Sequence, residues 1–556
     1  MQHALQTEAF NLLDCAGRAE RAASNYLETA LNATRARVAR AGSLDSKLFD
    51  IHQHAAHGVA WIATYVEAMR QMLAWAQALD RQRQLRECER SILTLLFGEY
   101  LAQLCGGIPM SQLEVARPGD LGLHSAAAQL GVDAAVATLV KAALEPALRR
   151  QVAELLAQGE RPRFHLGDES LELIHEQFRR LSDVKIAPYA HGWHLDNALI
   201  PLPLIEELGE MGVFGLALAH EHGGSGLGKL AVCVVSEELS RAYIGVGSLA
   251  TRSEIACELI AISGTPGQQR HFLPGLASGA IIPTAVFTEP DTGSDLASIK
   301  TRAELVTRAD GSRVWRVFGA KTWITHAARA DLMTLLVRTD PNASGYRGLS
   351  ILLAEKPREC DGVLFPAPGM SGSEIHVLGY RGMREYEIAF DGFEVPEAHL
   401  LGGVPGEGFK QLMQTFEGAR IQTGARAVGV AQNALELALR YSLERRQFGR
   451  RIFEFPRVHE KLAMMAGEVM AARQLNYFAA RSKDSGTRCD VQAGMAKLLG
   501  ARVAWACADA AVQIHGGNGF ALEYPVSRLL CDARVLSIFE GAAEIQAGII
   551  ARALLA

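Results

Sequence analysis

The chain has 556 residues and a mass of 60.1 kDa, and its 56 basic and 61 acidic residues give a net charge of −5. This length predicts about three or four domains and leaves ample chain for several hydrophobic cores. The 49% hydrophobic and 21% charged residues are typical of a globular protein and exclude a disordered or low-complexity chain. The slightly acidic balance offers no general attraction for nucleic acid or for an anionic membrane surface.

Cysteine usage and the hydropathy pattern bear on the compartment. The nine cysteines are odd in number and form no Cys-x-x-Cys pair, which favours reduced thiols over a disulfide framework or a zinc site. No apolar run approaches the roughly 20 residues that span a bilayer. The N-terminal sequence MQHALQTEAFNLLDCAGRAE lacks the apolar core of a signal peptide. We therefore expect a cytoplasmic protein without membrane insertion.

Residues 1–165 predict a helical extension at the N-terminus. Trp61, Tyr65 and Trp75 recur at steps that place them on one face of a helix. The polar segment 159–168, which contains Pro and Gly, marks the first domain boundary.

The rest of the chain predicts three further domains. Residues 166–283 are helix-rich, and residues 405–556 form long helices with few prolines, as in a four-helix bundle. Between them, residues 284–404 carry short β-branched runs separated by Asp-Gly, Gly-Tyr and Pro-Gly turns. The expected strands are 314–318, 332–339, 349–354 and 385–390. The predicted fold is mainly α with a β middle domain.

Two motifs suggest ligands but are better explained as ordinary structure. His52, His54 and His57 have no cysteine or carboxylate at metal spacing beside them, so a polar helix face is favoured and no metal site is expected. GGSGLGKL at 223–230 nearly fits a phosphate-binding loop. However, Leu230 stands where the magnesium ligand Ser or Thr is required, which favours a turn between helices.

Six blocks occur in order along the chain: AVFTEPDTGSDLASIKTRAE (285–304), KTWITHAARADL (321–332), FEGARIQTGARAVG (416–429), LERRQFGR (443–450), QIHGGNGF (513–520) and SIFEGAAEIQ (537–546). Together they resemble the acyl-CoA dehydrogenase family of flavoproteins, from about residue 166 to the end. The resemblance implies an α domain, a β-barrel domain and a four-helix bundle. It also implies FAD held between these domains and shared across the interface of a homo-oligomer, a dimer or a tetramer.

The positions that match the family's FAD contacts are Val286, Phe287, Thr288, Trp323, Ile324, Thr325, Arg445, Gln447, Phe448, Gln513, Ile514, Gly516, Gly517 and Glu544. The resemblance implies that Trp323 packs along the flavin and that Thr325 donates to N5, the atom that receives hydride. Among these positions, the positively charged and glycine residues after residue 444 are expected to bind the pyrophosphate and adenosine parts of FAD. Core packing of Trp323, and a simple helix-ending turn at 515–519, remain the alternatives.

Dehydrogenation of an acyl thioester requires a base for the α-proton, and a carboxylate in a dry pocket suits this role. Glu540 matches the position of the family's catalytic glutamate. Some relatives place the base where this chain has Ala419, which cannot serve, so Glu540 is expected to act. Its main-chain N–H would polarise the thioester carbonyl. The alternative is an exposed loop glutamate before a glycine.

The resemblance also implies where the acyl-CoA substrate binds. The CoA part is expected along Ser294, Phe416, Glu417 and Arg420. Glu385 is expected near the flavin edge or the acyl pocket.

The N-terminal extension, together with segments 52–73, 249–256 and 378–387, resembles a narrower group within the family. That group oxidises (2S)-methylsuccinyl-CoA to mesaconyl-C1-CoA in the ethylmalonyl-CoA pathway and passes electrons to electron-transferring flavoprotein. A short or branched monocarboxylic acyl-CoA is the alternative substrate. A flavin-containing protein associated with nucleic acid is a further alternative, which the balanced charge disfavours.

A dicarboxylic substrate brings a free carboxylate into an apolar pocket, where an unpaired charge costs several kcal/mol. Arg252 is expected to supply the compensating cation, with Arg384 and His326 as rivals. The alternative for Arg252 is a surface arginine paired with Glu254 or Glu258.

Overall fold

The computed structural model describes residues 11–556, so the first ten residues, on which the signal-peptide expectation partly rests, lie outside it. The chain divides into two compact units. The first comprises the residues up to Glu172 together with Thr423–Ser482 and Gly486–Ala556. The second comprises Leu173–Gln422 and Lys483–Ser485. The first unit therefore combines the N-terminal extension with most of the C-terminal helices.

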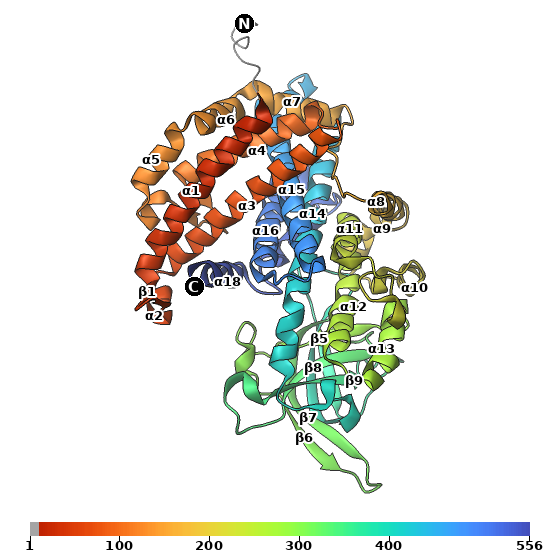
Figure 1. The fold of residues 1–556 in the computed structure, drawn as a ribbon. Coiled ribbons are helices and arrows are strands. Elements are labelled where there is room, and N and C mark those ends of the chain that lie inside the picture. Colours follow the sequence, from red (N-terminus) through yellow and green to blue (C-terminus); the bar gives the residue numbers. More distant parts are fainter. Residues whose placement is uncertain (1–10) are drawn as a thin grey trace, which may run out of the picture. The chain divides into compact units, whose positions relative to one another are not determined.

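The N-terminal part of the first unit is helical, as predicted (red to orange in Figure 1). Trp61, Tyr65 and Trp75 are all buried along one helix, α3, and this confirms the helical face inferred from their spacing. Helices α1 and α18 both pack on α3. The helices of this part are α1 (Leu12–Val38), α2 (Ser46–Ile51), α3 (Gln53–Arg81), α4 (Glu87–Gly106), α5 (His124–Val132), α6 (Ala134–Leu144) and α7 (Pro146–Ala157). Two short hairpins, β1 (Ala39–Arg40) with β2 (Ser43–Leu44) and β3 (Ile108–Pro109) with β4 (Val115–Ala116), connect them.

Long helices return at the C-terminus, and this confirms the predicted helical character of that region. They are α14 (Gly408–Glu444), α15 (Pro456–Asp484), α16 (Asp490–His515), α17 (Val526–Val535) and α18 (Ala543–Leu555). Helix α14 begins in the second unit and continues into the first. A hairpin of β12 (Arg446–Gln447) and β13 (Arg450–Arg451) follows it.

One buried polar cluster fastens the N-terminal extension to the C-terminal helices. The Tyr100 hydroxyl of α4 donates to Glu468 of α15 over 3.0 Å, and Arg502 of α16 donates to the same carboxylate oxygen. All three side chains are largely buried. A buried charge is tolerated only when it is paired and hydrogen-bonded, so this cluster fixes how α4 lies on α15 and α16.

The second unit combines short helices with one mixed sheet. Its helices are α8 (Glu169–Leu181), α9 (Ala187–Leu195), α10 (Leu202–Glu210), α11 (Gly228–Ala242), α12 (Ile244–Ser263) and α13 (Pro266–Ser278). Its strands are β5 (Pro283–Val286), β6 (Arg302–Thr307), β7 (Arg313–Thr325), β8 (Leu332–Arg338), β9 (Leu349–Glu355), β10 (Met370–Ile375) and β11 (Glu385–Pro396). The order is β10-β11-β7-β6-β8-β5, with β9 paired to β8.

All four predicted strands are present as β7, β8, β9 and β11. The pairings are antiparallel except that β8 runs parallel to β5 and β6. Register shifts between β11 and β7 bend this strand pair, and the sheet encloses a core that includes Val286, Ile324 and Tyr386. The unpredicted strands β5, β6 and β10 have at most six residues each, and most of β10 is exposed.

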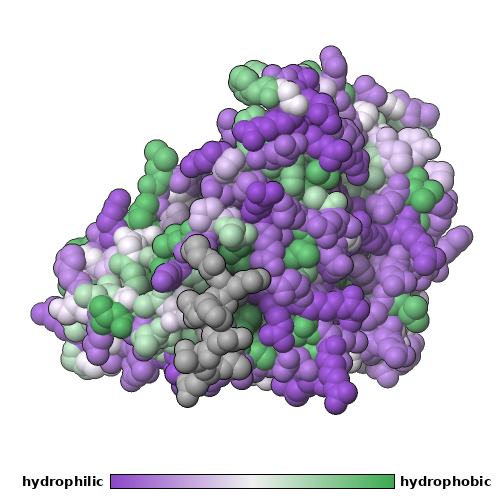
Figure 2. All heavy atoms as spheres, turned by 90° about the horizontal axis from the view of Figure 1, so that it is seen from above, coloured by the Kyte–Doolittle hydropathy of each residue, from purple (hydrophilic) through white to green (hydrophobic). Residues whose placement is uncertain are grey.

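The outer surface is predominantly polar on the face drawn in Figure 2, where hydrophobic residues form separate small patches. Among the described residues, no single helix has the length and apolar character to cross a membrane, although the bent pair α5 and α6 meets that test by length and composition. The nine cysteines are all free, and six of them are buried, which agrees with the reduced thiols expected from their spacing.

We predict that Glu468→Ala destabilises the protein by about 3–5 kcal/mol, because it leaves Arg502 charged and unpaired in a buried position. Urea unfolding followed by circular dichroism measures this change. Glu154→Ala, which removes one partner of the exposed Arg150 pair, is the matched control and should change stability by about 0.5 kcal/mol or less. Equal effects of the two substitutions would contradict the fastening role of the cluster.

Candidate active site

A buried lysine and glutamate shape the loop after β5, which opens the first of the six blocks. The Lys321 ammonium donates to the Phe287 carbonyl over 2.8 Å and to the Glu289 carboxylate over 3.0 Å. Glu289 also accepts the backbone N–H groups of Lys300 and Thr301. Burial lowers the pKa of Lys321 to about 8, although the neighbouring Glu289 opposes this shift. These contacts hold the main chain of 286–288, the predicted pyrimidine-side segment, in one conformation.

Trp323 is the most unusual residue of this region. Its side chain is 57% exposed on β7, while its neighbours Thr322 and Ile324 are buried. Its backbone has φ = 60°, a conformation that non-glycine residues adopt rarely and at a cost. The structure thus excludes the alternative of core packing. A large indole held outward on a rigid strand offers a flat surface for a planar ligand.

The two residues predicted for the flavin edge contact each other. The Thr325 hydroxyl donates to both carboxylate oxygens of Glu385, over 2.9 and 3.1 Å, where β7 and β11 pair. Val286 and Ile324 belong to the core of the sheet, so only their main-chain groups are available to a ligand.

The segment predicted for CoA begins α14. Phe416 packs beneath Arg420, whose guanidinium lies 5.7 Å from the ring centre. Glu417 is buried and accepts a hydrogen bond from Lys483 over 3.0 Å. Ser294 is exposed on the loop between β5 and β6. The structure therefore offers Ser294 directly to a ligand, while Glu417 already has a cationic partner.

Two carboxylates close to Arg252 in the sequence are paired with lysines. Lys229 contacts both Glu254 and Glu258, and Lys483 lies 3.1 Å from Glu258. Glu254 and Glu258 are thus both paired with lysines in the interior of the second unit. Lys229 is the second residue of α11 and is buried against these two carboxylates, which disfavours a phosphate-binding role.

Arg252 lines a small pocket of the second unit, together with His326 and mainly apolar residues. One guanidinium nitrogen donates to the Tyr380 hydroxyl over 3.0 Å. His326 is fully buried, and burial lowers its pKa to about 3, so it is neutral at physiological pH. Arg384 lies 3.3 Å from Glu374, which offsets its charge. The structure thus places Arg252 and His326 at one pocket and Arg384 beside a carboxylate.

In the first unit, Glu540 lies in a tight turn between α17 and α18. Its φ of 52° and the φ of 89° at Gly541 are both left-handed. The Lys497 ammonium donates to the Gly541 carbonyl over 2.6 Å, and Gln546 donates to the carbonyls of Glu540 and Gly541. The turn is strained at a non-glycine residue and held by side chains on both sides, a pattern that is common at functional sites.

The Glu540 side chain is only 15% exposed and has two polar partners that sequence reasoning missed. Arg426, which is fully buried, donates to Oε2 over 2.7 Å, and the Thr423 hydroxyl donates to the same oxygen. Arg426 also lies over the Phe539 ring. This burial excludes the alternative of an exposed loop glutamate. The sequence held one sign of this partner: Arg426 is the single charged residue in the stretch IQTGARAVGVA (421–431) of α14.

The residues predicted for the pyrophosphate and adenosine are exposed on two turns of the first unit. Phe448 and Gly449 form the tip of the β12–β13 hairpin, and Phe448 is 92% exposed. Helix α16 ends at Gly516, and side chains added at Gly516 or Gly517 would meet no neighbouring atom. The turn is fixed by Asn518, which donates to Tyr441 and Tyr524. The other predicted residues of this set are Arg445, Gln447, Gln513 and Glu544, which are exposed, and Ile514, which is buried.

The sequence did not predict that a carboxylate, Asp120, lies near one of the N-terminal histidines. His54 lies 3.3 Å from Asp120. This single contact is a polar pair on the surface of the extension.

Comparison with known proteins identifies the family. Three consecutive regions match the acyl-CoA dehydrogenase N-terminal domain (168–280), middle domain (284–393) and C-terminal domain (406–555). The chain belongs to the acyl-CoA dehydrogenase family. It is 60% identical over 532 residues to (2S)-methylsuccinyl-CoA dehydrogenase of Cereibacter sphaeroides, and the match covers 95% of each chain.

Solved structures agree with this assignment. Butyryl-CoA dehydrogenase from Megasphaera elsdenii matches with a TM-score of 0.64 and 31% identity, over 71% of this chain and 100% of that one. A glutaryl-CoA dehydrogenase from Mycobacterium smegmatis in complex with FADH2 matches with a TM-score of 0.63 and 28% identity, over 70% and 95%. This chain therefore has the acyl-CoA dehydrogenase fold.

The residues present suit the family's cofactor. The exposed indole of Trp323, the exposed Phe448 and the open backbone at Gly516 and Gly517 are ready contacts for a flavin and a dinucleotide. This acyl-CoA dehydrogenase is FAD-dependent.

We predict that Trp323→Ala weakens FAD binding by about 2 kcal/mol, or roughly 30-fold, because a large aromatic contact is lost. Fluorescence titration of the apoprotein with FAD measures the affinity. Trp505→Ala, at another exposed tryptophan on α16, is the matched control and should bind FAD normally. Unchanged affinity in the Trp323 variant would remove this residue from the cofactor site.

Proposed function

We propose that this chain dehydrogenates (2S)-methylsuccinyl-CoA to mesaconyl-C1-CoA. The observation that carries the proposal is the 60% identity to a methylsuccinyl-CoA dehydrogenase, which extends over 95% of this chain and so includes most of the N-terminal extension. The two similar solved structures cover only 70–71% of the chain. The shared extension therefore distinguishes this relative from shorter members of the family.

Glu540 is the base in this proposal. Its carboxylate takes the proton from Cα of the acyl group, and the electron pair of that C–H bond becomes the new Cα–Cβ double bond. When bound, FAD supplies the acceptor for the hydride that leaves Cβ. Arg426 lies 2.7 Å from the carboxylate and so fixes its position in this proposal.

The turn around Glu540 also positions its backbone. Lys497 and Gln546 bind the carbonyls of this turn and so fix its peptide groups. In this proposal the main-chain N–H of Glu540 polarises the thioester carbonyl. Arg426 and Thr423 act as positioning residues, since they hold the carboxylate and touch neither the thioester nor the flavin in this proposal.

The remaining site assignments are part of the same proposal. The predicted FAD contacts on β5, β7, the β12–β13 hairpin and the turn after α16 hold the cofactor. Ser294, Phe416, Glu417 and Arg420 contact the CoA part. We also propose that the domains end after residues 165, 283 and 404, as predicted. The electron acceptor in this proposal is electron-transferring flavoprotein. The enzyme is a homo-oligomer in the cytoplasm.

We predict that Glu540→Gln lowers kcat by about 10³-fold or more, because an amide cannot accept the α-proton. Steady-state assays with (2S)-methylsuccinyl-CoA and an artificial electron acceptor measure this loss. FAD content and absorbance serve as the folding check, and Glu407→Gln, at an exposed glutamate paired with Lys410, should retain full activity. A fully active Glu540 variant with bound FAD would eliminate the proposed base.

We predict that Arg252→Met raises KM for (2S)-methylsuccinyl-CoA by at least about 30-fold while changing KM for butyryl-CoA only slightly. The reason is that removal of the cation leaves the free carboxylate of the dicarboxylic substrate unpaired in a buried pocket. The exposed Arg347, changed to Met, is the matched control. Equal effects on the two substrates would refute the role of Arg252 and favour a monocarboxylic substrate.

A further inference from the structure

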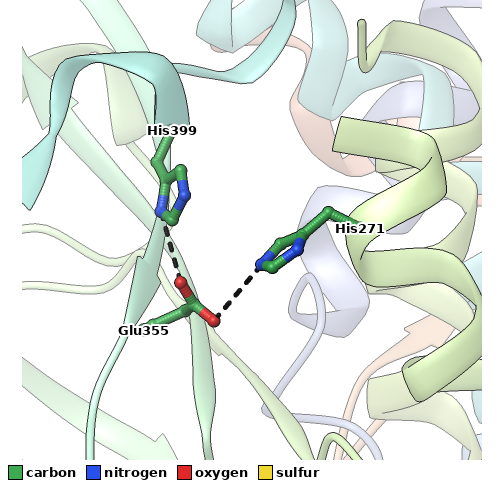
Figure 3. Close-up of side chains that lie close together, drawn as sticks. All are labelled: His271, Glu355 and His399. Atoms are coloured by element: carbon green, nitrogen blue, oxygen red, sulfur yellow. Dashed lines mark ion pairs between the residues drawn. The ribbon is translucent and has the colours of Figure 1, made fainter. Parts of the chain in front are cut away.

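Three side chains of the second unit, outside the sites described above, lie close together. His271 lies on α13, Glu355 ends β9, and His399 ends the 3₁₀ turn Glu397–His399 after β11. Figure 3 shows the two imidazoles directed at the carboxylate, each toward a different oxygen. One ligand atom from each residue lies within 4.8 Å of the other two.

The spacing suits a shared cation better than direct hydrogen bonds. His271 Nε2 lies 3.6 Å from Glu355 Oε1, and His399 Nδ1 lies 3.6 Å from Glu355 Oε2. Both separations exceed the usual hydrogen-bond range. Ligand bonds of about 2.0–2.2 Å around a tetrahedral zinc ion place neighbouring donor atoms roughly 3.3–3.5 Å apart. The two His–Glu separations are close to that value, and the third separation, which is at most 4.8 Å, would shorten when the ion binds.

The orientation of His399 is that of a metal ligand. Its Nδ1 is buried, has no hydrogen-bond partner and lies 3.6 Å from the Glu355 carboxylate. A buried polar nitrogen without a partner is costly, and a bound ion would satisfy it.

The scaffold that carries the three residues is rigid. Gln268, one helical turn before His271, donates to the carbonyls of Ala398 and Leu400, which flank His399. Its side-chain oxygen accepts the N–H of Gly402. Phe272 is buried beside both histidine rings. These hydrogen bonds and the packing of Phe272 hold α13 and the turn at His399 in fixed positions relative to each other, which preserves the spacing of the ligand atoms.

We propose that His271, Glu355 and His399 form a binding site for a divalent first-row transition metal, with Zn²⁺ as its physiological occupant. Two imidazole nitrogens and one carboxylate oxygen are a borderline donor set that suits Zn²⁺ and disfavours Ca²⁺ or Mg²⁺. The side chains of His271 and Glu355 are 58% and 49% exposed, so the ion enters from solvent and a water molecule completes its coordination. The bound ion links α13 to β9 and to the turn at His399.

The test is metal binding to the FAD-loaded enzyme after chelator treatment and dialysis. Isothermal titration calorimetry should find one Zn²⁺ per chain, and Zn²⁺ should raise the thermal unfolding midpoint. His271→Ala and Glu355→Gln should each weaken binding by at least about 30-fold and abolish the shift. His376→Ala, at an exposed histidine next to Glu374, is the matched control and should bind normally.

Three results would overturn the proposal: no saturable binding of one equivalent, binding that both site variants retain, or binding that the His376 variant loses equally. Substitution of Co²⁺ gives a second readout, because four-coordinate Co²⁺ with two imidazoles has intense visible absorption that the site variants should lack. Neither measurement depends on dehydrogenase activity, so a negative result leaves the proposed reaction untouched.

Discussion

The proposed chemistry of this enzyme depends on one ion pair, in which the Glu540 carboxylate lies beside a buried guanidinium. Arg426 has no exposed side-chain surface and lies 2.7 Å from Glu540, which belongs to the turn sequence IFEGAAEIQ of the first unit. Removing one partner of such a pair leaves the other charge uncompensated, at a cost of about 3–5 kcal/mol. The left-handed turn at Glu540 is therefore maintained by the ion pair as well as by Lys497 and Gln546.

The same constraint recurs wherever this fold buries charge. Lys229 lies between Glu254 and Glu258, Lys321 contacts Glu289, and Arg502 contacts Glu468. Each pair joins two different elements of the fold, so satisfying the charges also specifies how these elements pack. Tyr100 of the N-terminal extension donates a hydrogen bond to Glu468 of the last of these pairs. The extension is therefore attached by hydrogen bonds as well as by apolar contacts such as those of Trp61 and Tyr65.

Much of this organisation could be predicted from the sequence, because long periodic helices and β-branched strands depend on local patterns. The buried face of α3 and the strand at 314–318 are examples, whereas the block containing Glu540 was recognised by its resemblance to the family. Arg426 was not predicted as a partner of Glu540, since the two are 114 residues apart and no motif links them. The same holds for His271, Glu355 and His399, which only the tertiary fold brings together. Short strands such as β10 carry too little pattern to be recognised.

The most direct test is anaerobic mixing of the FAD-loaded enzyme with (2S)-methylsuccinyl-CoA or butyryl-CoA, with the flavin absorbance followed over time. The account predicts rapid loss of the oxidised flavin band with (2S)-methylsuccinyl-CoA and little or slow change with butyryl-CoA. Rapid bleaching by butyryl-CoA alone would contradict the proposed substrate while preserving the family chemistry. Failure of both thioesters to reduce the bound flavin would contradict the proposed reaction itself.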